Sequence, residues 1–297
     1  MTSLHRDQDV RSLVAAQLRD YQIDSVVLLG EGLDNVVYLV NDELIVRFSK
    51  EPDPEQRAVR VQREAGVLAA VADVVPVAVP AVRFTVVEQG CLAYSRLPGV
   101  PLLNLPRQQR LAHAAPIAAM LGRVLSSIHA IPAGRLTDLI ETDDQQPAGW
   151  LRDAAETYQT FMAHVPSSHW RAVEAFLAAA PPAEGYTLAF SHNDLGVEHV
   201  LVDPGTSTVT GIIDWSDAAL ADPAYDFGLL YRDLGPRALD VAFGSYRTDR
   251  DDLDSLRQRA VFYARCSVFE DLAYGIEMRW ESYVDNSLAA LDWLFPA

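Results

Sequence analysis

The first third of the chain alternates between short apolar runs and turn residues. Residues 8–20 place apolar side chains on one helical face, which predicts a short amphipathic helix, and helical spacing returns at 54–72. Apolar runs of strand length occupy 25–29, 36–40, 44–48, 82–87 and 91–94. Asn41-Asp42 is typical of a tight turn between two strands. This part of the chain is therefore predicted to be rich in strands, with a helix before them and another among them.

The rest of the chain is mostly helical in pattern. Apolar residues recur at helical spacing over 111–129, 150–163, 168–180 and 251–293. In the last of these segments, Glu270, Glu277 and Glu281 are predicted to form an acidic row beside an apolar stripe. Such a row either binds the ammonium groups of a substrate or is a solvated helix face.

One stretch interrupts the helical pattern, Ser191 to Asp217 (SHNDLGVEHVLVDPGTSTVTGIIDWSD). It holds a His-x-Asp triplet ending at Asp194, His199 five residues beyond, and a β-forming run that ends on Asp214. Turn residues join the two halves, so the carboxylates are expected close together. Phosphoryl transfer needs one carboxylate to orient a hydroxyl and another to hold Mg²⁺. A surface hairpin with scattered aspartates is the alternative, but the coincidence of these features favours an active site.

A glycine-containing loop joins the first two predicted strands, at residues 30–35 (GEGLDN). Gly30 and Gly32 would let the backbone approach phosphate groups closely. A plain hairpin is the alternative. The third strand and the helix that follow favour a phosphate-binding loop.

These motifs resemble the aminoglycoside phosphotransferase family. The likeness is carried by His192-x-Asp194 with His199, by IIDW at 212–215 and by DPAYDFG at 222–228. The HND…H…L pattern, GIID and a later EDLAYGI are most similar to the aminoglycoside 2''-phosphotransferase group. Most members carry Asn in place of His199, and the macrolide phosphotransferases share the histidine.

The resemblance covers nearly the whole chain and implies an α+β, bilobal, protein-kinase-like fold. It implies a small antiparallel five-stranded N-lobe with one helix, and a larger, mainly helical C-lobe. Residues 1–94 would form the nucleotide-binding lobe, 95–99 the hinge, and 100–297 the catalytic and substrate-binding lobe.

The resemblance also implies roles for single residues. Asp194 would accept or orient the proton of the substrate hydroxyl, while His199 and Asp214 would ligate Mg²⁺. Arg47 would lie on the α- and β-phosphates, paired with Glu64. Many relatives have Lys in place of Arg47, although the macrolide phosphotransferases resemble this chain there.

The nucleotide base is expected at the hinge, where backbone groups from Ser95 to Leu97 would bind the purine edge. Tyr94 would either limit the size of the purine pocket or be an ordinary core residue. A bulky residue there resembles the members that prefer GTP, so the resemblance implies GTP or ATP as donor. Asp226, near a helix N-terminus, is interpreted as a structural brace of the catalytic loop.

The acceptor is expected to be a cation. The formal net charge is −17, which argues against nucleic acid and anionic membranes as partners and suits a cationic small molecule. Candidate contacts are Asp217, which matches an acidic position of the 2''-phosphotransferase group, and Glu270, Asp271 and Glu277. Acidity that only aids solubility is the alternative.

Composition narrows the class further. The 297 residues are 49% hydrophobic and 22% charged, as in an ordinary globular protein, and could form one large domain or two lobes. The two cysteines, Cys91 and Cys266, are too few for a disulfide framework. The N-terminus has no signal-peptide core and no stretch approaches a spanning length, so a cytoplasmic monomer is expected.

Three functions remain open from the sequence. The first is an antibiotic O-phosphotransferase, acting on an aminoglycoside or else on a macrolide or tuberactinomycin-type peptide. The second is a metabolic small-molecule kinase for choline, an amino sugar or homoserine. The third is a non-catalytic binding module, which is disfavoured because Arg47, Glu64, Asp194 and Asp214 are all present.

Overall fold

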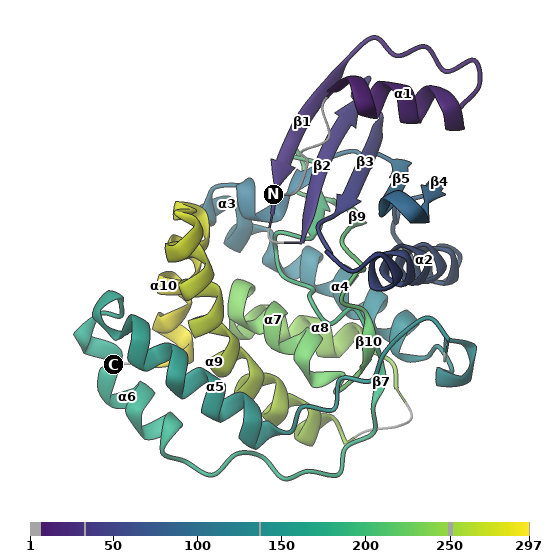
Figure 1. Cartoon of the computed structure of the whole chain (residues 1–297). Helices are drawn as coiled ribbons and strands as arrows, with labels where there is room; N and C mark the ends of the chain where they lie inside the picture. The colour runs from purple at the N-terminus through teal and green to yellow at the C-terminus, as the bar shows by residue number, and fades with distance from the viewer. Residues whose placement is uncertain (1–6, 33, 137, 249–251, 297) are drawn as a thin grey trace.

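The computed structural model describes residues 7–32, 34–136, 138–248 and 252–296. Leu33 of the predicted glycine loop and Asp251 at the start of the last predicted helix lie outside the described residues. A sheet lobe and a helical lobe make up the molecule, joined near the end of the fifth strand (Figure 1).

The sheet lobe contains a five-stranded antiparallel sheet in the order β1-β2-β3-β5-β4. Its strands are β1 (Val26–Glu31), β2 (Asn35–Val40), β3 (Leu44–Ser49), β4 (Val82–Val86) and β5 (Cys91–Ser95). The predicted strands are confirmed within two residues at each end. The β2–β3 turn is confirmed too, since Asn41 and Asp42 both have positive φ, 53° and 60°.

Alternation along the strands gives the sheet two different faces. On one face, Tyr38 and Val46 pack with Val10 and Val14 of α1 (Asp7–Gln17) in a small core. The opposite face carries Val37, Ile45 and Arg47, which line a large cleft. Because successive side chains of β3 point to opposite faces, Arg47 lies on the face that lines the cleft.

The helix α2 (Pro54–Val71) begins where the sequence predicted, with Asp53 capping its first turn through hydrogen bonds from Glu55 N and Gln56 N. Its apolar residues Val67, Leu68 and Val71 join the core of the helical lobe. This helix consequently ties the sheet to the second lobe.

The helical lobe is built from α3 (Arg107–Ala112), α4 (Ala114–His129), α5 (Pro147–Phe161), α6 (Ser167–Leu177), α7 (Ala224–Leu234), α8 (Pro236–Ser245), α9 (Leu253–Met278) and α10 (Glu281–Leu294). Short strands pair as β6 (Val100–Pro101), β8 (Val200–Val202) and β9 (Val209–Ile212), and as β7 (Ala189–Ser191) with β10 (Ala219–Ala221). Single-turn 3₁₀ helices lie at Val87–Gln89, Leu102–Asn104, Ala133–Arg135 and Met162–His164. The predicted change from strands to helices is confirmed.

Two predicted helices are each divided in the structure. The segment 111–129 breaks at His113, because the ring of Pro116 would clash with the carbonyl of Ala112 in a continuous helix. The segment 251–293 breaks at Arg279, which has a left-handed φ of 58°. The predicted acidic row is therefore wrong in one member, since Glu281 lies on α10 and not on α9.

Close packing between α9 and α10 explains the second break. A Cβ on Gly275 would lie 2.8 Å from the Cβ of Tyr283 and 2.9 Å from the backbone nitrogen of Val284. The chain reverses after Arg279, with Trp280 N donating to Gly275 O at 2.8 Å. No helix in the described part of the chain has the length and apolar character needed to cross a membrane.

Helix packing predicts the outcome of two matched glycine substitutions. A Cβ on Gly122 of α4 would collide with the backbone carbonyl of Ala242 on α8, whereas Gly244 of α8 has no atom within 4 Å of its Cβ position. We expect Gly122→Ala to lower the free energy of unfolding by about 1–3 kcal/mol through overpacking. Gly244→Ala should raise it by about 0.5–1 kcal/mol, because alanine restricts the unfolded chain.

Urea unfolding followed by circular dichroism provides the measurement for both variants. Equal stabilities for the two variants would contradict the close approach of α4 and α8.

Candidate active site

The loop from His192 to His199, called here the HND loop, connects β7 to β8 at the floor of the cleft. Asp226 of α7 holds its first residues: the carboxylate accepts hydrogen bonds from His192 N at 3.1 Å and Asn193 N at 2.9 Å. Asn193 has a positive φ of 63°, so this bracing fixes a backbone conformation that few residues adopt. The structural role predicted for Asp226 is confirmed.

Two buried histidines support the same loop. His129 Nε2 lies 3.2 Å from Asp226 Oδ2, and its Nδ1 lies 3.0 Å from the Tyr246 hydroxyl. His192 Nε2 donates to Ile213 O at 3.1 Å, which ties the HND loop to the residue before Asp214. Burial lowers the pKa of His192 to about 4, so this imidazole acts as a neutral donor. Both histidines therefore hold the loop in place.

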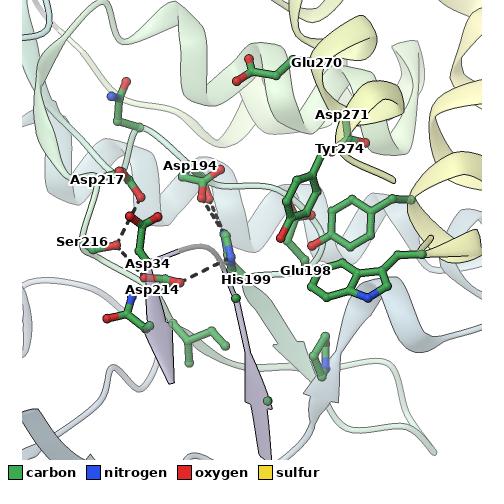
Figure 2. Close-up of a pocket in the computed structure, with 18 of the residues that line it drawn as sticks. Asp34, Asp194, Glu198, His199, Asp214, Ser216, Asp217, Glu270, Asp271 and Tyr274 are labelled. Atoms are coloured by element: carbon green, nitrogen blue, oxygen red, sulfur yellow. Dashed lines mark hydrogen bonds and ion pairs between the residues drawn. The ribbon is translucent and has the colours of Figure 1, made fainter. Parts of the chain in front are cut away.

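The structure brings together the candidates that the sequence separated. His199 lies between two aspartates: its Nδ1 is 3.3 Å from Asp194 Oδ2, and its Nε2 is 3.8 Å from Asp214 Oδ2. Nδ1 also donates to the carbonyl of Asp194 at 2.7 Å, which directs Nε2 toward Asp214 (Figure 2). The expected proximity of the two carboxylates follows from these contacts.

Arg47 connects the sheet lobe to this group. Its guanidinium forms an ion pair with Glu64 of α2, and its Nη1 lies 3.1 Å from Asp214 Oδ1. The side chain of Ser216 donates to the same Oδ1 at 2.8 Å. The predicted Arg47–Glu64 pair therefore exists, and it extends to Asp214.

Charges in the cleft shift the pKa values of Asp194 and Asp214 in opposite directions. Burial raises the pKa of Asp194 to about 6, because the charged form loses solvation, although His199 opposes the rise. Burial would also raise the pKa of Asp214, but Arg47 and His199 outweigh it and hold that pKa well below its usual value. Asp214 is thus a permanent anion beside two cations, while Asp194 has the more basic carboxylate.

His199 has an unusual environment of its own. Burial would lower the pKa of its imidazole, but Asp194, Glu198 and Asp214 outweigh burial and raise it to about 9. The protonated, positively charged form of the His199 imidazole is therefore favoured.

The cleft between the lobes has a volume of about 1500 Å³ and holds most of the predicted binding residues. On the sheet side it is lined by Gly30, Gly32, Arg47, Tyr94 and Leu97. β1 continues through Gly30 to Glu31, so the glycine loop is shorter than predicted.

The hinge differs in detail from the expected purine site. Ser95 N donates to Ala81 O at 3.0 Å and Arg96 N to Glu43 O at 2.8 Å, so both amides are engaged within the sheet lobe. Ser95 is not among the residues that line the cleft, whereas Leu97 is. Leu97 is consequently the better placed of the predicted hinge contacts.

Acidic residues line the opposite wall. Asp217, Glu270 and Glu277 are exposed and face the cleft. Asp271 also lines it but is 9% exposed, with Oδ1 3.6 Å from Arg232 Nη1 and Oδ2 accepting from Ser287 Oγ at 2.8 Å. The contacts of Asp271 are thus inside the protein, and its predicted role in substrate binding stays a prediction.

The sequence analysis missed further residues of the cleft. Glu198 lies beside His199, and Asp143 accepts a hydrogen bond from Asn193 Nδ2 at 3.1 Å. Aromatic rings of Trp150, Tyr225, Tyr274, Trp280 and Tyr283 also line it. Glu198 could have been found from the sequence, because it is a charged residue next to His199 in an otherwise apolar stretch. Asp143 lies in a polar linker where nothing sets one acidic residue apart from its neighbours.

Comparison with known proteins agrees with this geometry. A family model described as the phosphotransferase enzyme family matches residues 25–261. The viomycin phosphotransferase of Streptomyces vinaceus is 27% identical over 202 residues, which cover 64% of this chain and 69% of that protein.

Two solved structures illustrate the shared fold. The complex of APH(2'')-IIIa with GDP and kanamycin has a TM-score of 0.69 at 22% identity, covering 95% of this chain and 97% of that one. The macrolide 2'-phosphotransferase MphH from Brachybacterium faecium has a TM-score of 0.63 at 24% identity, covering 96% and 98%. The expected bilobal, kinase-like fold is confirmed.

The brace at the HND loop predicts a large effect from a small substitution. In Asp226→Asn, the side-chain amide NH₂ would face a backbone N–H that now donates to a carboxylate. We expect a loss of about 2 kcal/mol or more in the free energy of unfolding, because the hydrogen bonds are buried and charged.

Asp240→Asn is the matched control, since Asp240 pairs with Arg257 on the surface and its side chain is 64% exposed. Removing that ion pair should change the stability by no more than about 0.5 kcal/mol. Urea midpoints measure both variants, and a similar small change in the two would contradict the bracing role of Asp226.

Proposed function

This chain belongs to the phosphotransferase enzyme family, and within it we propose that the protein moves the γ-phosphate of a nucleoside triphosphate to a hydroxyl of a cationic antibiotic. The observation that carries the proposal is that Asp194 and the Arg47–Glu64–Asp214 chain meet in one cleft, with His199 between the two aspartates. An aminoglycoside is the favoured acceptor, and phosphorylation of it would confer resistance.

The donor half of the reaction uses the sheet face of the cleft. Arg47 would supply a fixed positive charge beside the α- and β-phosphates, and its ion pairs with Glu64 and Asp214 keep it in position. The backbone near Gly30 and Gly32 allows the close approach of phosphate oxygens. Tyr94 and Leu97 close the base end of the cleft.

The acceptor half uses the HND loop. Asp194 would accept a hydrogen bond from the substrate hydroxyl, align it with the γ-phosphorus and take its proton as the new bond forms. The raised pKa of Asp194, about 6, leaves the carboxylate mostly ionised near pH 7 and yet more basic than an exposed aspartate. Asp217, Glu270 and Glu277 would attract the ammonium groups of the acceptor.

The donor set fits a magnesium ion. Asp214 and His199 would hold the ion, since Asp214 offers a carboxylate of low pKa and His199 Nε2 lies 3.8 Å from its Oδ2. His199 would bind through Nε2 after losing its proton, since Nδ1 donates to the carbonyl of Asp194. A bound Mg²⁺ would neutralise phosphate charge.

A second acceptor class has one observation in its favour. The relative from Streptomyces vinaceus is a viomycin phosphotransferase, and it shares 27% of residues with this chain over the matched region. A peptide antibiotic is therefore the alternative to an aminoglycoside, and both are cations that suit an acidic wall.

A nucleotide-consumption assay tests the proposal with purified protein, Mg²⁺, ATP or GTP, and a panel of kanamycin, gentamicin, streptomycin, viomycin and a macrolide. We expect phosphorylation of at least one cationic member, detected by mass spectrometry as the addition of one phosphate. Turnover of choline, an amino sugar or homoserine alone would favour the metabolic alternative.

Asp194→Asn tests the assigned base. We expect kcat to fall by about 100-fold or more while the affinity for nucleotide stays within about twofold, because Asp194 contacts the hydroxyl and not the phosphates. Nucleotide binding is measured by calorimetry on the same preparation. A variant that keeps more than about a tenth of the wild-type kcat would remove Asp194 from this role.

The donor preference is a separate expectation. Tyr94 and Leu97 line the cleft, where Tyr94 would limit the purine pocket, and guanine can shift along the hinge to present another hydrogen-bonding edge. We therefore expect kcat/KM for GTP to equal or exceed that for ATP. A tenfold advantage for ATP, which corresponds to about 1.4 kcal/mol, would contradict this expectation.

A further inference from the structure

Glu198 is a carboxylate of the HND loop that none of the roles above uses. One of its carboxylate oxygens, one of Asp194 and one ring nitrogen of His199 all lie within 4.8 Å of one another. Figure 2 shows Glu198 on the side of His199 away from Asp214, toward Tyr274. It therefore lies on the acceptor side of the catalytic aspartate, and Asp214 lies on the phosphate side.

Gly196 provides the space that Glu198 occupies. A Cβ at position 196 would collide with both carboxylate oxygens of Glu198. The backbone of Gly196 does not adopt a left-handed conformation, so a side chain is excluded by the carboxylate and not by backbone strain. The loop thus places this carboxylate at a defined position.

The cations that interact with the Glu198 carboxylate are His199, Arg232 and Arg110, and all three are shared with other carboxylates. Arg232 is 4% exposed and its guanidinium is held by Asp233, with Nε to Oδ1 at 2.8 Å, and by Asp271 at 3.6 Å. Asp233 Oδ2 also accepts from Val197 N at 3.1 Å, which anchors the residue before Glu198. The Arg232 guanidinium already has two carboxylate partners.

The charged groups near the site include more carboxylates than cations. The cations are Arg47, Arg110, His199 and Arg232, and the carboxylates are Glu64, Asp194, Glu198, Asp214, Asp233 and Asp271. A half-buried carboxylate in excess of its cations is costly, and a positively charged ligand group would relieve that cost.

A polar group on the same wall also lacks a partner. Ser267 lies on α9 one turn before Asp271, is 2% exposed and is among the residues that line the cleft. Its hydroxyl has no hydrogen-bond partner among the residues that the structure describes. A polar substituent of a bound acceptor would supply one.

We propose that Glu198 binds an ammonium group on the acceptor carbon next to the phosphorylated hydroxyl, and so selects acceptors that carry an amine beside that hydroxyl. The proposal rests on the proposed function. The reactive hydroxyl has to lie within hydrogen-bond distance of Asp194, about 3 Å. A substituent on the neighbouring carbon can then reach a carboxylate that is within 4.8 Å of Asp194.

Two variants and a matched acceptor pair test this inference. Glu198→Gln removes the charge and keeps the shape, whereas Gly196→Ala keeps the charge and displaces the carboxylate, which is the flexible end of its side chain. Glu174→Gln is the control, because it makes the same chemical change on an exposed residue of α6 outside the cleft. The acceptors are congeners with an amine or a hydroxyl beside the phosphorylated hydroxyl.

We expect Glu198→Gln and Gly196→Ala to weaken binding of the amine congener by about tenfold or more, and that of the hydroxyl congener by less than about threefold. Calorimetry measures binding, and steady-state kinetics measure KM for acceptor and nucleotide and the Mg²⁺ concentration for half activity. The nucleotide KM and the Mg²⁺ requirement should not change. Glu174→Gln should match the wild type throughout.

The outcomes separate this inference from the proposed function. Turnover of both congeners with no amine preference, or with a preference that both variants keep, would overturn the role of Glu198 and leave the proposed function standing. Amine-selective binding that the variants lose, without turnover, would support Glu198 and contradict the proposed function. A shifted Mg²⁺ requirement with unchanged acceptor binding would assign Glu198 to the metal and overturn the inference.

Discussion

The arrangement of the cleft depends on one buried guanidinium. Arg47 projects from the third strand, pairs with Glu64 of α2 and reaches Asp214 at the end of the strand beyond the HND loop. It is 7% exposed, so removing either carboxylate would leave a charge that the protein interior solvates poorly. The two lobes are thereby held in register by the same side chain that is proposed to contact the phosphates.

The HND loop is fixed from the opposite direction. Asp226, with His129 behind it, holds the backbone of His192 and Asn193, while His192 reaches Ile213. These contacts come from α4, α7 and the residue that follows β9, and apolar residues of these elements belong to one continuous core. Catalytic geometry within a fraction of an ångström needs this kind of support, because small displacements of a reacting group lower the rate steeply. The loop is therefore tied to the helices around it.

Surplus negative charge distinguishes the acceptor side of the cleft. Arg232 is a buried cation there, but Asp233 and Asp271 already surround it, and Glu198 adds a third carboxylate. The formal charge of −17 for the whole chain says only that cations are attracted at long range. The position of each carboxylate decides which ammonium of an acceptor is bound, and the charge total does not contain that information.

The sequence by itself determined the strands, the change to helices, the Asn41-Asp42 turn and the bracing role of Asp226. These follow from local periodicity, turn chemistry and motif spacing, which act over a few residues. The pairing of Arg47 with Glu64 was implied by the family resemblance. Only the tertiary structure decided that Glu198 lies beside Asp194, that Asp271 is engaged by Arg232, and that the amides of Ser95 and Arg96 are already bonded. It also divided the last helical segment at Arg279, because α10 has to return along α9. Contacts between residues far apart in the chain set these features, and no local pattern encodes which partner a charged side chain meets once it is buried.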